Sequence, residues 1–184
     1  MGQPTADWLR RRFGAELTWL PFDLHPEYPP EGIPRAELRA RYGDRFHGRV
    51  EAMFAAAGLA YAPPPDVVSN TRRALRLTEL ARERGHHEAA HDRLMDAYWA
   101  EGLDIGDEEV LHRLAVEVGL DVAEVARVLE GDEYLDAVQA STRRAHSAGV
   151  TGVPAWLLDG RLLVLGAQPR EVFEQAFEQL RGEA

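Results

Sequence analysis

The sequence predicts an α/β protein in which a long helical block interrupts a smaller group of strands and helices. Three observations predict this class. Glu16–Leu20 alternates polar and apolar residues, which is the pattern of a half-buried strand. Residues 34–149 repeat apolar positions with helical spacing. Two short apolar runs then follow on either side of Asp159-Gly160. The predicted order is therefore helix, strand, helical block, β-hairpin and helix.

The N-terminal part combines a helix, the strand and a loop. Apolar residues between Trp8 and Phe13 share nearby faces of one helical stretch, which Gly14 can end. Pro21 interrupts pairing after the strand. Residues 25–34 are too rich in proline for a regular element, so we expect a loop there.

The helical block is divided by glycine, proline and capping residues. The predicted breaks are, in order, Gly43, Pro63-Pro64-Pro65, Gly85, Gly102, Gly119 and Gly131. Asn70 and Asp107 are expected to be N-caps, and Asp121 forms a capping-box pattern with Glu124. The last helix of the block is expected to run from about Glu133 to Gly149.

The C-terminal part is predicted to be a hairpin followed by a helix. Ala155–Leu158 and Leu162–Leu165 are the apolar runs, and Asp159-Gly160 favours a tight turn because glycine tolerates positive φ. Pro169 opens the final helix, which carries apolar residues on one side.

Composition restricts the functional classes. The 184 residues include 31 acidic and 21 basic side chains, a net charge of −10. This balance argues against a protein that binds a nucleic-acid backbone. No apolar run approaches the roughly 18 residues that cross a bilayer, and the N-terminus lacks the apolar part of a secretory signal. We therefore expect a soluble, cytoplasmic protein without a membrane partner.

Cysteine is absent from these 184 residues. This absence excludes disulfides, thiolate metal sites and cysteine nucleophiles from the chain as given. All the basic residues other than histidine are arginine, a bias that indicates a GC-rich genome more than a function.

His87 and His91, with Glu88 between them, form the His-Glu-x-x-His pattern that can bind zinc on a helix. A third histidine does not follow at the longer spacing of that motif. The two histidines also share a helical stripe with Leu94 and Tyr98, which favours residues beside a core. We therefore predict no metal site and no cofactor.

His25 lies in the proline-rich loop and is a candidate general base. No serine or aspartate partner stands at a readable spacing. The interpretation as an ordinary loop histidine is therefore favoured.

Thr151-Gly152-Val153-Pro154 leads into the first strand of the hairpin. A trans proline is ordinary at the first residue of a strand. A cis Val153–Pro154 bond would instead turn the Val153 N–H and C=O outward, where they could pair with an extended peptide. The local sequence leaves both arrangements open.

Six short motifs occur in order along the chain. They are Trp19–Pro26, Asn70–Ala74, His91–Tyr98, Gly102–Ile105, Thr151–Pro154 and Gly166–Pro169. Together with the order of the elements, this series resembles the thioredoxin-like DsbA family, and most closely its FrnE-like dithiol–disulfide oxidoreductase branch.

The resemblance implies an α/β fold with a thioredoxin-like sheet that lacks its first strand. Residues 1–33 and 150–184 would form that discontinuous domain, and residues 34–149 would form a large all-helical insertion domain. It also implies that Thr151, Gly152, Val153 and Pro154 form a substrate-binding cis-proline segment, with Asn70 near the substrate face.

The chain departs from the family at the redox motif. In the family a strand and a Cys-x-x-Cys come first, and neither is present here. Met1-Gly2 resembles the end of the family's Cys-Pro-x-Cys-Tyr-Leu-Gly stretch, so we expect Met1 to be an internal methionine. The missing strand would also expose sheet edges, which favours self-association as a homodimer.

A zinc hydrolase with His87 and His91 as ligands ranks last among the candidate functions, after three others. The first is a DsbA-family oxidoreductase for thiol–disulfide exchange or isomerisation, inactive as given because it has no catalytic cysteine. Its partners would be thiol- or disulfide-containing proteins and peptides, or glutathione. The second is a non-redox module that binds thiol peptides or glutathione. The third is a glutathione-dependent isomerase of the 2-hydroxychromene-2-carboxylate isomerase type, in which a serine can replace the nucleophilic cysteine.

Overall fold

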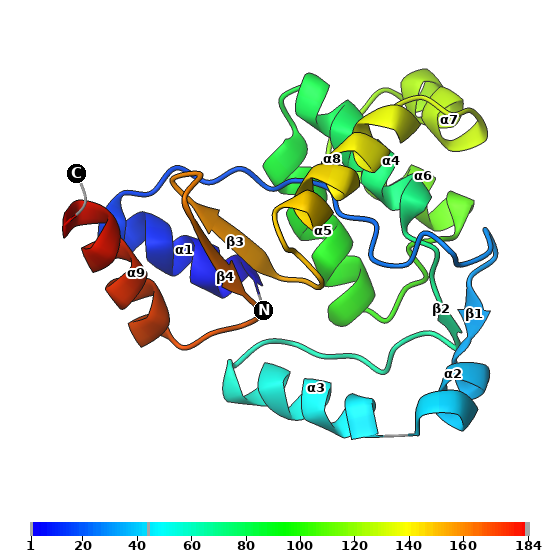
Figure 1. The fold of residues 1–184 in the computed structure, drawn as a ribbon. Coiled ribbons are helices and arrows are strands. Elements are labelled where there is room, and N and C mark those ends of the chain that lie inside the picture. Colours follow the sequence, from blue (N-terminus) through cyan, green and yellow to red (C-terminus); the bar gives the residue numbers. More distant parts are fainter. Residues whose placement is uncertain (1, 44, 183–184) are drawn as a thin grey trace. The chain divides into compact units, whose positions relative to one another are not determined.

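The computed structural model describes residues 2–43 and 45–182, which divide into two compact units (Figure 1). Unit 1 contains the residues up to Trp19 and those from Arg143 onward, and unit 2 contains Leu20–Thr142. The sequence boundaries at 33/34 and 149/150 followed breaks in secondary structure. The boundaries between the two units follow tertiary contacts instead. One lies after Trp19, and the other lies within a helix, between Thr142 and Arg143.

Unit 1 is built from a β-hairpin and two helices. These elements are α1 (Gly2–Phe13), β3 (Ala155–Leu158), β4 (Leu162–Leu165) and α9 (Arg170–Gly182). The strands pair antiparallel, with Ala155 opposite Leu165 and Leu158 opposite Leu162. Asp159 and Gly160 both have positive φ, of 52° and 66°. The predicted Asp-Gly hairpin is therefore confirmed.

The core of unit 1 lies between one face of the hairpin and the two helices. Its buried residues are Ala6, Leu9, Trp156, Leu158, Val164 and Phe173. Phe173 is fully buried, and its ring meets the Trp156 ring edge-to-face at 5.7 Å. Phe13 of α1 stacks on Phe177 of α9 with ring centroids 4.0 Å apart. Aromatic packing thus joins both helices to the hairpin.

The segment after α1 differs from the prediction. Residues 14–20 form no regular element, so the predicted strand over Glu16–Leu20 was wrong. The alternation that predicted it is nevertheless present: Ala15, Leu17 and Trp19 are half-buried against the unit 1 core, and the residues between them are exposed. A strand also needs a hydrogen-bonded neighbour, which alternation alone does not reveal.

Unit 2 is mainly helical, as predicted. Its elements are β1 (Ile33–Pro34), α2 (Arg35–Tyr42), α3 (Arg45–Ala56), β2 (Val67–Val68), α4 (Arg72–Glu83), α5 (His87–Trp99), α6 (Glu108–Glu117), α7 (Val122–Glu130) and most of α8 (Leu135–Ser147). The proline-rich loop ends in β1, which pairs antiparallel with β2. The loop prediction missed this pairing because the partner lies more than thirty residues away.

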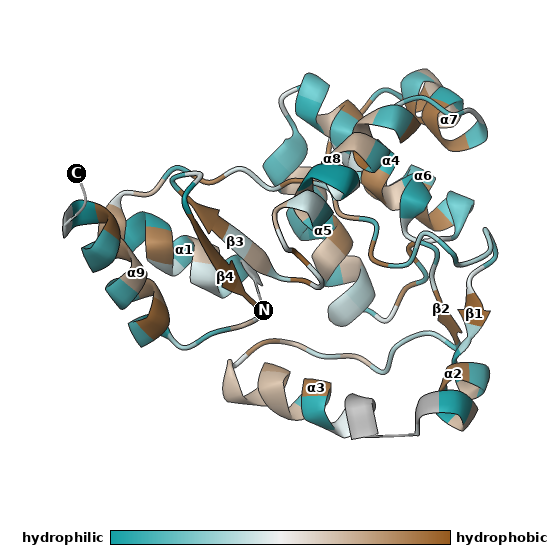
Figure 2. Ribbon diagram, viewed as in Figure 1, coloured by the Kyte–Doolittle hydropathy of each residue, from teal (hydrophilic) through white to brown (hydrophobic). Residues whose placement is uncertain are grey.

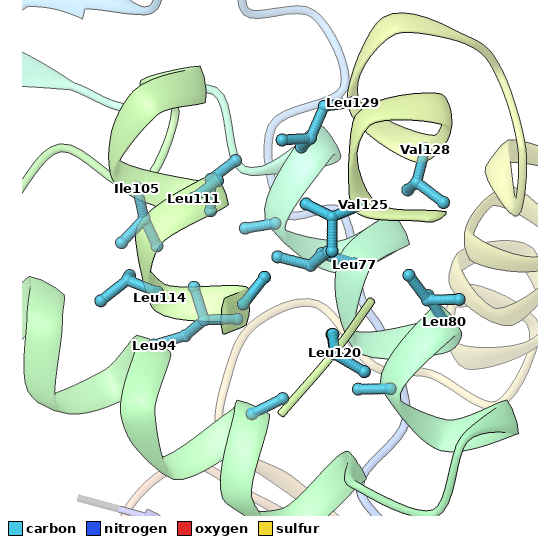
Figure 3. Packing of buried hydrophobic residues seen from close by; sticks show 14 of the residues in the cluster. Leu77, Leu80, Leu94, Ile105, Leu111, Leu114, Leu120, Val125, Val128 and Leu129 are labelled. Carbon is cyan, nitrogen blue, oxygen red and sulfur yellow. The ribbon is translucent and has the colours of Figure 1, made fainter. Parts of the chain in front are cut away.

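Helices α4 to α7 surround the core of unit 2. In Figure 2 these helices carry hydrophobic residues on one side and hydrophilic residues on the other. Figure 3 shows the buried side chains that meet between them, including Leu77, Leu94, Leu111, Leu114 and Val125. Their burial supplies the main driving force for packing these helices.

The observed helix caps agree in part with the caps predicted from the sequence. The Asp107 side chain accepts a hydrogen bond from Val110 N, and that of Asp121 accepts from the backbone N–H groups of Ala123 and Glu124. Both N-cap predictions are confirmed. Glu124, however, pairs with Arg84 at 2.6 Å, so it is engaged in an ion pair between helices.

The start of α4 is arranged differently from the prediction. Thr71 occupies the N-cap position, and Asn70 stands one residue earlier. The Asn70 side chain still supports this end of the helix, because its Oδ1 accepts a hydrogen bond from Arg72 N at 2.9 Å.

Candidate functional site

The Thr151–Pro154 segment is fixed at both ends within unit 1. On one side, Val150 N donates to the Ala145 carbonyl oxygen at 3.0 Å, and His146 Nδ1 lies 3.1 Å from the Val150 carbonyl oxygen. On the other side, Gly166 N donates to the Pro154 carbonyl oxygen at 2.8 Å. The end of α8 and the start of the hairpin thus hold the segment in place.

Between these anchors the backbone is open. The Val153–Pro154 peptide bond is cis, and the Val153 side chain is 57% exposed. Among residues 2–43 and 45–182, the backbone groups of Thr151, Gly152 and Val153 have no hydrogen-bond partner. They are therefore available to an extended chain that approaches from outside.

The N-terminal turn of α1 lies beside Pro154. A Cβ atom built on Gly2 would stand 3.9 Å from Pro154 Cβ and 3.0 Å from the Trp19 ring. Gly2 and Trp19 were not among the predicted site residues, although both stand in stretches on which the family resemblance rested.

Asn70 belongs to unit 2. Its Nδ2 donates to the carbonyl oxygens of Tyr28 at 2.8 Å and Pro29 at 3.3 Å. Together with the bond from Arg72 N, these contacts tie the proline-rich loop to α4. A place for Asn70 near a substrate stays a prediction.

Asn70 also lines a polar pocket of about 380 Å³ in unit 2. The other lining residues are Pro30, Glu31, Arg73, Asp104, Gly106, Asp107 and Glu108. Arg73 lies 3.6 Å from Glu108, and Asp104 accepts hydrogen bonds from Ser69 Oγ at 2.5 Å and Gly106 N at 2.8 Å. Several of these polar groups are thus already paired with one another.

His87 and His91 lie on α5 with ring centroids 6.4 Å apart. Arg82 places its guanidinium 2.8 Å from His87 Nε2, so this nitrogen accepts a hydrogen bond. Burial lowers the pKa of both histidines, that of His91 to about 4. Within the described ranges, no group of three or more histidine, aspartate or glutamate side chains is arranged to hold a metal ion.

His25 is engaged within the proline-rich loop. Its Nδ1 lies 3.1 Å from Glu27 Oε1, and its ring stacks on Tyr28 with centroids 4.4 Å apart. A hydrogen bond from its own backbone N–H, and then one from the His25 side chain, lower the pKa of the Glu27 carboxyl. Arg72 holds the same loop by donating to the Pro26 carbonyl oxygen at 2.8 Å.

The model of the DSBA-like thioredoxin domain family matches residues 1–178. The chain belongs to this family. It is thus a DsbA-like protein with a thioredoxin-type fold and a helical insertion, and its 184 residues contain no Cys-x-x-Cys.

Known proteins are similar to this DsbA-like chain in sequence or in structure. The probable DsbA oxidoreductase SCO1869 from Streptomyces coelicolor is 37% identical, with a TM-score of 0.87 over 99% of this chain and 82% of its own. The uncharacterized protein YwbO of Bacillus subtilis (strain 168) is 29% identical over 163 residues, 88% of this chain and 80% of its own. A 2-hydroxychromene-2-carboxylate isomerase shares the fold, with a TM-score of 0.75 at 18% identity, over 97% of this chain and 88% of its own.

No helix in the described part of the chain combines the length and the apolar character needed to cross a bilayer.

Proposed function

We propose that this DsbA-like chain binds an extended peptide that contains a thiol or a disulfide, and that it does so at Thr151, Gly152, Val153 and Pro154. The observation that carries the proposal is the Val153 backbone, which has no hydrogen-bond partner among the described residues and precedes Pro154, beside Gly2 of α1. The family and the similarity to SCO1869 support the substrate class.

The chemistry divides into two parts. The Val153 N–H and C=O pair with the peptide backbone, as in recognition by strand addition. The sulfur of the peptide lies near Pro154 and Gly2 of α1, which are neighbours in unit 1. Disulfide exchange also requires an attacking thiolate. A cysteine that completed such a redox site would have to lie outside these 184 residues.

The proposal gives the two parts of the chain separate roles. Residues 1–33 and 150–184 form the thioredoxin-like domain that holds the peptide, and residues 34–149 form the helical insertion. Placement in the FrnE-like branch, a cytoplasmic location and homodimer formation stay predictions.

Peptide binding tests the proposal directly. We would titrate the chain with a labelled peptide whose cysteine is S-methylated, and measure fluorescence anisotropy. Val153→Pro removes the donor N–H and should weaken binding by about tenfold, the cost of one hydrogen bond. Val153→Thr keeps the backbone and the branched shape, so it should bind like the wild type. Equal binding by both variants, with unchanged circular dichroism, would refute the role of the Val153 backbone.

Three further measurements test which ligand is bound and whether disulfides are exchanged. A peptide with serine in place of cysteine tests whether sulfur matters, and glutathione tests whether a tripeptide is sufficient. In a third arm, the chain should not accelerate the reduction of insulin disulfides by a small dithiol, because it brings no thiol of its own. Acceleration by this cysteine-free chain would contradict the expectation that it binds the peptide without exchanging disulfides.

A further inference from the structure

Helix α8 ends in a pair of backbone hydrogen bonds of the Schellman type. Gly149 N donates to the His146 carbonyl oxygen at 2.9 Å, and Val150 N donates to the Ala145 carbonyl oxygen at 3.0 Å. Gly149 has the positive φ, 91°, that this ending requires. Val150 is only 8% exposed, so its carbonyl oxygen, which lies beyond the helix, requires a hydrogen-bond donor.

The imidazole of His146 supplies this donor. His146 Nδ1 lies 3.1 Å from the Val150 carbonyl oxygen, and no other group in residues 2–43 and 45–182 donates to that oxygen. A carbonyl oxygen can only accept a hydrogen bond, so the proton of this contact belongs to Nδ1. A hydrogen bond of this kind determines which imidazole nitrogen is protonated. The structure thus gives His146 a defined tautomer, with the hydrogen on Nδ1.

This bond fixes one end of the segment proposed to bind the peptide. Thr151 follows Val150 directly, and the next fixed backbone group is the Pro154 carbonyl oxygen, which accepts from Gly166 N at 2.8 Å. The backbone between these two anchors makes no hydrogen bond within the described chain. The direction of the Val153 N–H and C=O therefore depends on how firmly both anchors are held. Among the described groups that hold the anchors, His146 Nδ1 is the one that belongs to a side chain.

We infer that His146 is a positioning residue for peptide binding, because its Nδ1–H holds the Val150 carbonyl oxygen and thereby limits the conformations of Thr151–Val153. A binding segment that is already ordered loses less conformational entropy when a ligand arrives. His146 acts through Val150 and is assigned no contact with the peptide. This inference rests on the proposed function, since it assigns a role in the same binding event.

The position of the acceptor separates this role from ordinary helix capping. A basic side chain near a helix C-terminus often stabilises the helix by bonding to its last carbonyl groups. Helix α8 ends at Ser147, whereas the acceptor of His146 is Val150, beyond the helix. The bond therefore acts mainly on the segment that follows. His146 is also exposed, so its replacement leaves the hydrophobic core of unit 1 intact.

Peptide binding by His146→Leu and His146→Asn tests the inference. We would use the S-methylated cysteine peptide and fluorescence anisotropy, as for Val153. Leucine removes the donor, and we expect the dissociation constant to rise about fivefold, the effect of one neutral hydrogen bond. Asparagine has an amide N–H close to the position of Nδ1, so it should restore most of the affinity. The urea midpoints of both variants should stay near that of the wild type, because the site is exposed.

Ser147→Ala is the matched control. Ser147 Oγ donates to the Arg143 carbonyl oxygen at 3.0 Å, so this change also removes a bond from a side chain to the backbone at the end of α8. Its acceptor belongs to the helix, whereas that of His146 anchors the binding segment. Ser147→Ala should therefore bind the peptide like the wild type. An equal loss of affinity in Ser147→Ala and His146→Leu would assign the effect to helix α8 and overturn the inference.

The tautomer of His146 provides a readout that needs no peptide. We would record nitrogen NMR spectra of the imidazole rings in the unchanged chain at about pH 9, where imidazole groups are neutral. The signals of His146 are those that disappear in His146→Asn. We expect the hydrogen on Nδ1, as the bond to Val150 requires. A hydrogen on Nε2 would overturn the inference, and this readout holds even if His146→Leu does not fold.

Failure of this inference can be distinguished from failure of the proposed function. If the wild type binds the peptide and His146→Leu binds it equally well, the role of His146 is refuted and peptide binding at Val153 stands. If the wild type does not bind, the proposed function is refuted first, and the positioning role with it. A loss of affinity in His146→Leu that asparagine does not restore would also refute His146 as the donor that matters.

Discussion

At the scale of single residues, His91 links stability to pH. Burial disfavours the charged imidazolium and lowers the pKa of His91 from 6.5 to about 4. Because the folded pKa lies below the unfolded one, this stability is present above pH 6.5 and is lost as the pH falls toward 4. We expect His91→Gln, which cannot be protonated, to flatten that part of the curve. Urea midpoints measured across this pH range test the expectation.

The control for His91 is His86→Gln, an exposed position just before α5. Carboxylates also titrate in this range, so the informative quantity is the difference between each variant and the wild type. His86→Gln should follow the wild-type curve. A His91→Gln curve with the same slope as that of the wild type would show that His91 is not protonated during unfolding.

Buried polar residues were the hardest to predict from sequence. Arg76 is only 4% exposed and donates to the carbonyl oxygens of Gly131 and Leu129 at the end of α7. Because α4 contains several other arginines, the sequence alone suggests that the Arg76 side chain is exposed to solvent. Its acceptors are backbone groups more than fifty residues away, which the local pattern does not mark. The loop contacts of Asn70 were missed for the same reason.

At the scale of elements, the N-cap of α7 offers a graded test. The Asp121 carboxylate accepts from two backbone N–H groups, whereas that of Asp107 accepts from one at the start of α6. Replacing such a cap by alanine costs about 1 kcal/mol. We therefore expect Asp121→Ala to lower the free energy of unfolding by about 1 kcal/mol, and by more than Asp107→Ala. Urea denaturation measures both.

Asparagine provides the matched control at both caps, because its side-chain oxygen accepts the same hydrogen bonds. Asp121→Asn and Asp107→Asn should retain most of the stability that the alanine variants lose. If Asp121→Asn were as unstable as Asp121→Ala, the charge at the helix terminus rather than the cap geometry would be the source.

Elements with local signals were predicted, and those that depend on a distant partner were not. Helices α6 and α7 were recognised from apolar spacing and capping aspartates, and the hairpin from Asp159-Gly160. β1 was assigned to a loop and the segment at Glu16–Leu20 to a strand, because strand identity depends on a neighbour that sequence spacing does not reveal. The candidate segment at Val153 was predicted from the family resemblance and stays a prediction, whereas its proximity to Gly2 required the tertiary fold.

At the scale of the whole molecule, the two units have separate hydrophobic cores. Most of the helices belong to unit 2, whereas Trp8, Trp19 and Trp156 belong to unit 1 and only Trp99 to unit 2. Tryptophan emission therefore reports mainly on unit 1, and far-ultraviolet circular dichroism reports mainly on unit 2. This uneven distribution makes it possible to ask whether the units unfold together.

Phe173→Ala provides that test. Phe173 is fully buried against Trp8 and Trp156, so its truncation should cost about 3–5 kcal/mol in unit 1. We expect the urea midpoint from tryptophan emission to fall more than the midpoint from circular dichroism. Leu111→Ala, a fully buried residue in the core of unit 2, should produce the opposite order. Coincident transitions in both variants would show instead that the two cores unfold as one cooperative unit.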